Sequence, residues 1–196
     1  MSKGEDTRAR ILDEAMNQVS VRGMAGVSLG DLATALGLSK SGVLKHFQSM
    51  EALQDALIES MIARFTAAIW APAKPLEPGR ARLDEIFERD LAWTDGESVR
   101  GGCPLTATAI ELDDQPGPLR DKLKAGQLLW AKTLQREFQA LRPGIDEESA
   151  RTMAFQLKGI ILAYSHSRRM LDDETARAQA KAAYRSLVGE TSPTPA

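Results

Sequence analysis

The chain has 196 residues, 43% of them apolar and 27% charged, and a net charge of −2 at pH 7. This composition is typical of a globular protein with a sizeable core, and it excludes a strongly basic nucleic-acid coat protein. No run approaches the roughly 20 apolar residues of a membrane-spanning helix. The single cysteine, Cys103, cannot form an internal disulfide. We therefore expect one or two domains and a reducing, cytoplasmic location without a targeting segment.

Helical periodicity runs through nearly the whole chain, and no stretch alternates like a strand. We predict an all-α fold of about nine helices: a three-helix N-terminal domain and a larger helical C-terminal domain. Proline and glycine separate the later helices, and the segment from Ala71 to Pro78 should not continue a helix. The predicted helices are Thr7–Arg22, Ser28–Leu36, Lys40–Phe47, Ser49–Trp70, Gly79–Thr94, Pro104–Leu112, Pro118–Leu141, Asp146–Leu171 and Asp173–Val188.

The second and third predicted helices have the pattern of a helix-turn-helix. Ser28 can cap the first of them, with Asp31 three residues further on. Gly37 lies at the turn, where a positive φ is cheapest for glycine. Ser39 can cap the next helix, which would begin at Lys40 and lie in the DNA major groove. The pattern alone also fits an ordinary helical hairpin.

Several stretches near the N-terminus stand in one register. They are A-R-I-L-D-E-A (Ala9–Ala15), Arg22-Gly23, V-S-L-G-D-L-A (Val27–Ala33), L-G-L-S-K-S-G-V-L-K-H-F (Leu36–Phe47) and S-M-E-A-L (Ser49–Leu53). In this register, Thr7–Leu53 resembles the DNA-binding domain of TetR-family transcriptional repressors. R-G-G-C-P-L (Arg100–Leu105) and D-D-Q-P-G-P-L-R-D (Asp113–Asp121) are similar to one branch of that family. The resemblance implies a sequence-specific DNA-binding regulator.

The predicted reading helix supplies most of the candidate DNA contacts. Lys40 or Lys45 can donate to guanine edges, and Gly42 permits close approach of the backbone. Two departures from the family pattern bear on affinity: Leu44 and Lys45 stand where a tyrosine is common, and Met50 stands where a lysine is common. Lys45 is then expected to replace the tyrosine contact as a point charge. The full predicted DNA-binding set is Ser28, Ser39, Lys40, Ser41, Gly42, Leu44, Lys45 and His46.

The breaks between helices suggest a domain organisation. Residues 1–48 form the DNA-binding domain, and residues 49–190 form a regulatory and dimerisation domain whose first part, 49–70, is a connecting helix. Residues 191–196 are predicted to be a disordered tail. The resemblance implies a homodimer through the last two helices, one with a wide apolar stripe and one rich in alanine. Internal packing is the alternative interpretation of both features.

The larger domain is expected to hold an unidentified small-molecule effector in an apolar cavity. Core packing is the alternative interpretation of each candidate side chain, and the favoured one. Cys103 could be a redox or electrophile sensor or a small apolar residue, and Lys158 could pair with an acidic effector or extend to solvent. The candidates are Phe87, Leu91, Cys103, Thr106, Ile110, Leu128, Trp130, Leu134, Phe155 and Lys158.

An enzyme and a helical adaptor are the competing classes. No catalytic or nucleotide-binding motif is present, and His46, Cys103 and His166 lack the spacing of a metal site. We predict no enzymatic activity, no cofactor and no metal. The expected mechanism is a dimer that reads an inverted repeat in double-stranded DNA and leaves it when an effector favours another conformation.

Overall fold

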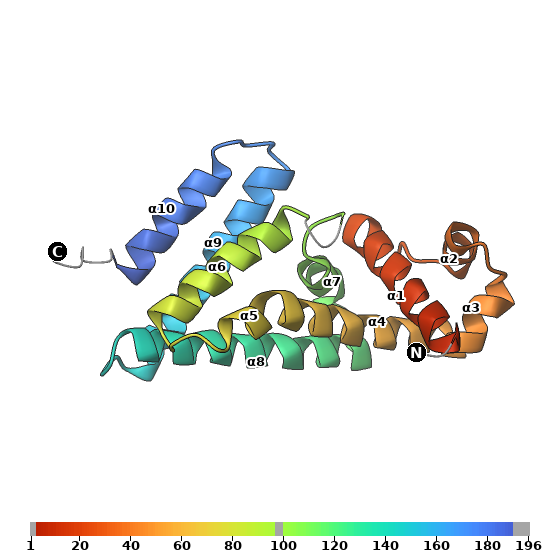
Figure 1. Cartoon of the computed structure of the whole chain (residues 1–196), viewed down its shortest axis with the longest axis horizontal. Coiled ribbons are helices and arrows are strands. Elements are labelled where there is room, and N and C mark those ends of the chain that lie inside the picture. The colour runs from red at the N-terminus through yellow and green to blue at the C-terminus, as the bar shows by residue number, and fades with distance from the viewer. Residues whose placement is uncertain (1–2, 97–99, 190–196) are drawn as a thin grey trace. The chain divides into compact units, whose positions relative to one another are not determined.

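The computed structural model describes residues 3–96 and 100–189, and its regular structure in these ranges is helical (Figure 1). The run formed by α4, η1 and α5 is continuous, so the described ranges contain nine helical runs, as predicted. The predicted tail at 191–196 lies outside them. The elements are α1 (Lys3–Arg22), α2 (Leu29–Leu36), α3 (Lys40–Phe47), α4 (Met50–Phe65), the π-helical segment η1 (Thr66–Trp70), α5 (Ala71–Ala73), α6 (Arg80–Thr94), α7 (Pro104–Leu112), α8 (Pro118–Leu141), α9 (Glu147–Arg169) and α10 (Ala176–Val188).

The fourth helical run continues past the point where the first proline should have ended it. Pro72 lies in the first turn of α5, directly after η1. Within the continuous run, Pro72 follows the π-helical turn of η1, where the hydrogen-bond register changes and the missing N–H can be accommodated. The backbone N–H of Lys74 still donates to the carbonyl of Trp70 at 2.8 Å. The interpretation that helix stops before Pro72 was therefore wrong.

Capping explains where the last two helices begin. Asp146 precedes α9, and its carboxylate accepts from the backbone N–H of Ser149 at 2.8 Å. The final helix begins at Ala176, later than predicted. Asp173 accepts from both the backbone N–H and the hydroxyl of Thr175, at 2.8 and 2.7 Å. These bonds stabilise a turn ahead of α10, so the predicted start at Asp173 was too early.

Packing divides the chain into two units, each made of two segments. One comprises Met1–Ala67 and Gly96–Gln127, and the other comprises Ala68–Asp95 and Leu128–Ala196. In the first, α7 and the start of α8 pack with α1 to α4. The second contains α6, α9, α10 and the rest of α8. The functional boundary predicted after residue 48 remains a prediction.

The first unit is centred on apolar side chains from α1, α2, α3 and α4. An ion pair reinforces it: Nζ of Lys122, on α8, lies 2.5 Å from Asp55 and 2.9 Å from Glu59, both on α4. These two carboxylates raise the pKa of Lys122 above its ordinary value. The fully or almost fully buried residues of this core include Ile11, Ala15, Met16, Val19, Leu32, Val43, Phe47, Leu53, Leu57, Ile58 and Met61.

In the second unit, α9 and α10 run side by side in opposite directions, and α6 packs against them (Figure 1). The ring of Phe87 stacks on that of Tyr184, with centroids 4.1 Å apart. The buried carboxylate of Glu137 lies 3.1 Å from the guanidinium of Arg82 and accepts from the N–H of Gly79 at 2.9 Å. Glu137 therefore anchors the start of α6 to α8.

Candidate nucleic-acid interface

The turn between α2 and α3 is formed by local bonds that the sequence predicts. Gly37 ends α2 with a φ of 65°. The backbone N–H of Leu38 then donates to the carbonyl of Ala33 at 2.8 Å, which closes the end of α2. Ser39 caps α3, because its Oγ accepts from the N–H of Gly42 at 3.0 Å. These bonds set the angle between the two short helices.

Helix α3 has one face in the core and one in solvent. Val43 and Phe47 are buried against the other helices of the unit, whereas Lys40, Ser41 and Lys45 are exposed. Two ammonium groups and a hydroxyl therefore project from a short helix that its neighbours hold firmly. Such a helix has the hydrogen-bond donors and the fixed orientation that recognition of bases in the major groove requires.

The two lysines differ in their surroundings. A Cβ built on Gly30 would lie 3.2 Å from Cε of Lys40, so the end of the Lys40 side chain lies against Gly30 of α2. Lys45 is exposed in the last turn of α3, next to the half-buried Leu44 and His46. Lys45 is thus the cation of α3 that extends more freely toward solvent.

The other predicted contacts lie around this face. Ser28 is exposed, and its Oγ accepts from the N–H of Asp31 at 3.0 Å as the cap of α2. Ser39 and Ser41 bring their hydroxyl oxygens within 3.0 Å of each other. Gly42 is half-buried, and a Cβ there would lie 3.2 Å from Oγ of Ser39. The hydroxyls are therefore already ordered by local bonds.

A tight turn leads from α3 into α4. Gln48 has a φ of 64°, and its N–H donates to the carbonyl of Leu44 at 2.7 Å. Ser49 then caps α4 by accepting from the N–H of Ala52 at 3.1 Å. Backbone hydrogen bonding and the hydroxyl of Ser49 lower the pKa of Glu51.

Glu111 is a residue of this region that sequence reasoning missed. It lies on α7, yet its carboxylate accepts from the backbone N–H groups of Met24 and Ala25, between α1 and α2. The separation of more than eighty residues leaves almost no local signal for this contact. The one local signal in the sequence is the glycine at position 23, a residue type that tolerates a positive φ. In the structure its φ is 76°.

The predicted effector residues fall in both units. Those in the first unit, Cys103, Thr106 and Ile110, lie at the start of α7 or on it. Cys103 occupies the N-cap position and is half-buried, and Ile110 is exposed. Those in the second unit are Phe87, Leu91, Leu128, Trp130, Leu134, Phe155 and Lys158.

The residues in the second unit differ in exposure. Phe87, Leu91 and Leu134 are buried, and Lys158 is half-buried. Trp130 is also half-buried and meets Trp70 edge-on, with ring centroids 6.2 Å apart. Leu128 and Phe155 are exposed. The cavity prediction therefore stays a prediction.

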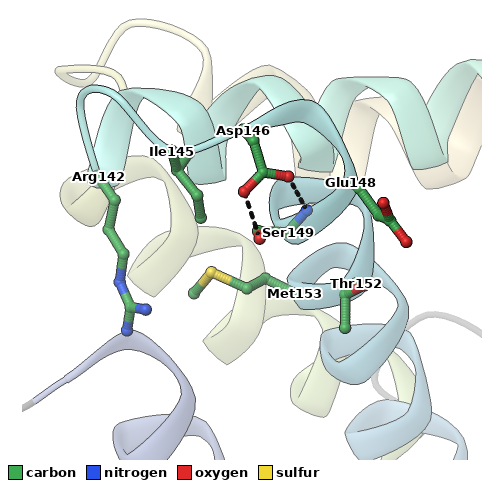
Figure 2. Close-up of a pocket in the computed structure, with 7 residues that line it drawn as sticks. All are labelled: Arg142, Ile145, Asp146, Glu148, Ser149, Thr152 and Met153. Atoms are coloured by element: carbon green, nitrogen blue, oxygen red, sulfur yellow. Dashed lines mark hydrogen bonds between the residues drawn. The ribbon is translucent and has the colours of Figure 1, made fainter.

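A hollow in the second unit lies at the turn between α8 and α9 (Figure 2). In it, the two carboxylate oxygens of Asp146 accept from the N–H and the hydroxyl of Ser149. These bonds cap α9 and lower the pKa of Asp146. None of the predicted effector residues lines this hollow. The lining residues are Arg142, Ile145, Asp146, Glu148, Ser149, Thr152 and Met153.

A capped helix-turn-helix with an exposed basic second helix defines a DNA-binding protein of the helix-turn-helix class. Two family models match the sequence. Residues 11–57 match "Bacterial regulatory proteins, tetR family", and residues 79–184 match "Tetracyclin repressor-like, C-terminal domain". The second match alone spans more than half of the chain. The chain belongs to the TetR family of transcription regulators, which are transcription factors rather than enzymes.

Solved structures give the same fold. A TetR regulator from Chloroflexus aurantiacus J-10-fl is 27% identical, with a TM-score of 0.75 over 96% of this chain and 95% of that chain. One from Legionella pneumophila is 21% identical, with a TM-score of 0.80 over 95% and 98%. AibR, solved in complex with isovaleryl coenzyme A and operator DNA, is 20% identical, with a TM-score of 0.73 over 92% and 97%. A comparison with curated proteins found no match.

No helix in the described ranges is long and apolar enough to cross a membrane. No group of three or more histidine, cysteine, aspartate or glutamate residues within 3–96 and 100–189 could hold a metal ion.

Proposed function

We propose that this chain is an effector-responsive transcriptional repressor that binds an inverted-repeat operator as a homodimer. The exposed face of α3 carries the proposal, because Lys40, Ser41 and Lys45 project together from a helix whose opposite face is buried. Lys45 would donate to a guanine edge or a phosphate, and Lys40 would act from the start of the helix. Ser28 and His46 would contact phosphates at the rim.

The exposed surface of α9 and α10 supports the proposed dimer. The apolar stripe that suggests an interface from sequence, including Met153 and Leu157, covers the chain's own core. A different face of α9 leaves Phe155 76% and Leu162 48% exposed. Alanines such as Ala182 are exposed on α10. Pairing two such hairpins into a four-helix bundle would remove this apolar surface from water.

A dimer would give the DNA contact its specificity. Two copies of α3, related by a twofold axis, would enter successive major grooves about one helical turn apart. Each copy reads the same half-site, so the operator would be an inverted repeat. The chain's net charge of −2 makes non-specific binding weak, and affinity then depends on the local placement of Lys40 and Lys45.

The proposed effector would act by linkage. AibR, a structural neighbour, was crystallised with both a coenzyme A thioester and operator DNA, and its shared fold supports a small-molecule site in the C-terminal region of this chain. A ligand that binds more tightly to a conformation with misaligned α3 helices would lower operator affinity by the same free energy. The candidate residues for that site are those predicted above other than Phe155, which lies on the proposed dimer face.

Selection of bound duplexes from a random DNA pool tests this function. We expect enrichment of an inverted repeat, and affinity that falls steeply with salt as phosphate counterions are released. A Lys40→Ala/Lys45→Ala protein should enrich nothing. If the folded, dimeric wild type enriches no sequence, the proposal is wrong and a helical adaptor becomes the better interpretation.

A further inference from the structure

The connection between α1 and α2 is held by a carboxylate from α7. Oε2 of Glu111 accepts from the backbone N–H of Met24 at 2.5 Å, and Oε1 accepts from the N–H of Ala25 at 2.6 Å. Gly23 makes room for this arrangement: its φ is +76°, and a Cβ there would lie 2.6 Å from Oε2. Because both oxygens are engaged, the carboxylate fixes the orientation of this connection as well as its position.

A second bond holds the same end of α1. The backbone N–H of Gly101, just before α7, donates to Oγ of Ser20 at 3.0 Å. That hydroxyl donates in turn to the carbonyl of Asn17 at 2.8 Å, and Ser20 is only 7% exposed. A side chain at position 101 would overlap the backbone carbonyl of Ser20. The chain leading into α7 therefore lies directly against the backbone of α1.

We propose that Glu111 is a positioning residue for operator binding. Its carboxylate sets the direction in which the chain leaves α1, and therefore the angle at which α2 and α3 are presented to DNA. This inference rests on the proposed DNA-binding function of α3. Glu111 lies within the segment that matches the C-terminal family model, whereas Met24 and Ala25 lie within the DNA-binding model. An acidic side chain from the segment matching the C-terminal model thus holds the backbone of the segment matching the DNA-binding model.

Charge and positioning predict opposite effects for one substitution. Glu111→Gln removes a negative charge, which by electrostatics alone would strengthen binding to the DNA polyanion. The amide that replaces the carboxylate presents only one acceptor oxygen, so one of the two backbone N–H groups loses its partner. Asp114→Asn is the matched control, because it removes the same charge from an exposed residue just after α7.

The test measures affinity for the selected operator and for the same half-sites separated by one extra base pair. Glu111→Gln should bind the operator about tenfold more weakly, the order expected when a hydrogen bond to a charged carboxylate is lost. Its preference for the correct spacing should also shrink, which a mere loss of stability would not cause. Amide exchange at Met24 and Ala25 should become faster. Asp114→Asn should match the wild type.

A Glu111→Gln protein that binds both duplexes as Asp114→Asn does would overturn the inference. Ser20→Ala gives an independent arm if Glu111→Gln does not fold. It removes the acceptor for Gly101, and it should also weaken operator binding and spacing preference. Wild-type affinity and spacing preference in Ser20→Ala would then overturn the inference. If the wild type itself binds no duplex, the proposed function fails first, and this inference fails with it.

Discussion

Two glycines with almost the same φ allow the cost of backbone strain to be measured separately from the cost of a steric clash. Gly79 has a φ of 87° and Gly144 one of 88°, values that only glycine adopts easily. They differ in their neighbours. A Cβ on Gly79 would lie 2.8 Å from the backbone N of Leu141, whereas a Cβ on Gly144 would have nothing within 4 Å. The residues therefore form a natural pair for measuring the two effects.

Gly79→Ala should destabilise the chain much more than Gly144→Ala. The strained backbone alone should cost about 1 kcal/mol in Gly144→Ala. Gly79→Ala adds a collision with backbone atoms and disturbs the bond from its N–H to Glu137, for a total of about 3 kcal/mol or more. Urea unfolding of both proteins measures the difference. Equal losses would mean that α8 moves aside at no cost.

Lys45→Ala should weaken operator binding without lowering the melting temperature. The side chain is exposed, so its loss leaves the core intact. The slope of log affinity against log salt should fall by about 2 for a dimer, one for each subunit. Lys124→Ala, at an exposed position on α8, controls for the change in net charge. A lower melting temperature with unchanged operator affinity would contradict the assignment of Lys45.

Asp90 should make the stability of the chain fall as the pH rises. It is 9% exposed on α6, and burial raises the pKa of its carboxyl from 3.8 to about 7. Between these pH values the folded chain keeps a proton that the unfolded chain has lost, so the free energy of unfolding decreases with pH.

Asp90→Asn should remove this decrease, since asparagine does not ionise. Near neutral pH and above, the variant should be the more stable protein, by up to about 4 kcal/mol. Unfolding in urea between about pH 4 and pH 8 measures the difference between the two curves. Curves that stay parallel over the whole range would show that Asp90 ionises normally in the folded chain.

At the scale of the element, helices α3 and α9 each depend on an N-terminal cap. Ser39→Ala removes the acceptor for the N–H of Gly42 and should cost about 1 kcal/mol. Because α3 is the proposed reading helix, operator affinity should fall as well. Asp146→Ala removes the corresponding cap of α9 and should cost a similar stability with no effect on DNA binding. Paired measurements of unfolding and affinity decide this, and equal affinity losses would argue against a special role for α3.

The sequence predicts the parts of the fold that depend on interactions between residues close together in the chain. Ser28, Gly37 and Ser39 act on neighbours within a few residues, so the helix-turn-helix could be read directly. Pro72 misled because η1 changes the hydrogen-bond register just before it, and no residue preference announces a π turn. The contacts of Glu111 could not be found, because they join backbone groups that only the folded chain brings together.

At the scale of the whole molecule, the dimer should be separable from the fold. Phe155→Arg places a charge on the exposed face of α9 and should give a folded monomer with much weaker operator binding. Leu129→Arg makes the same change at an exposed leucine of α8 and should remain dimeric. Light scattering gives the mass of each protein in solution. A dimeric Phe155→Arg protein would move the interface elsewhere.

The assembly of the first unit from two distant segments limits how this regulator can be recombined with its relatives. A hybrid that took only its first 57 residues would lose Glu111, the partner of Met24 and Ala25, and Lys122, the partner of Asp55. A hybrid that also carried Gly96–Gln127 would keep these contacts. The proposed operator preference would therefore depend on both segments of the first unit, and a single crossover point is not expected to transfer it intact.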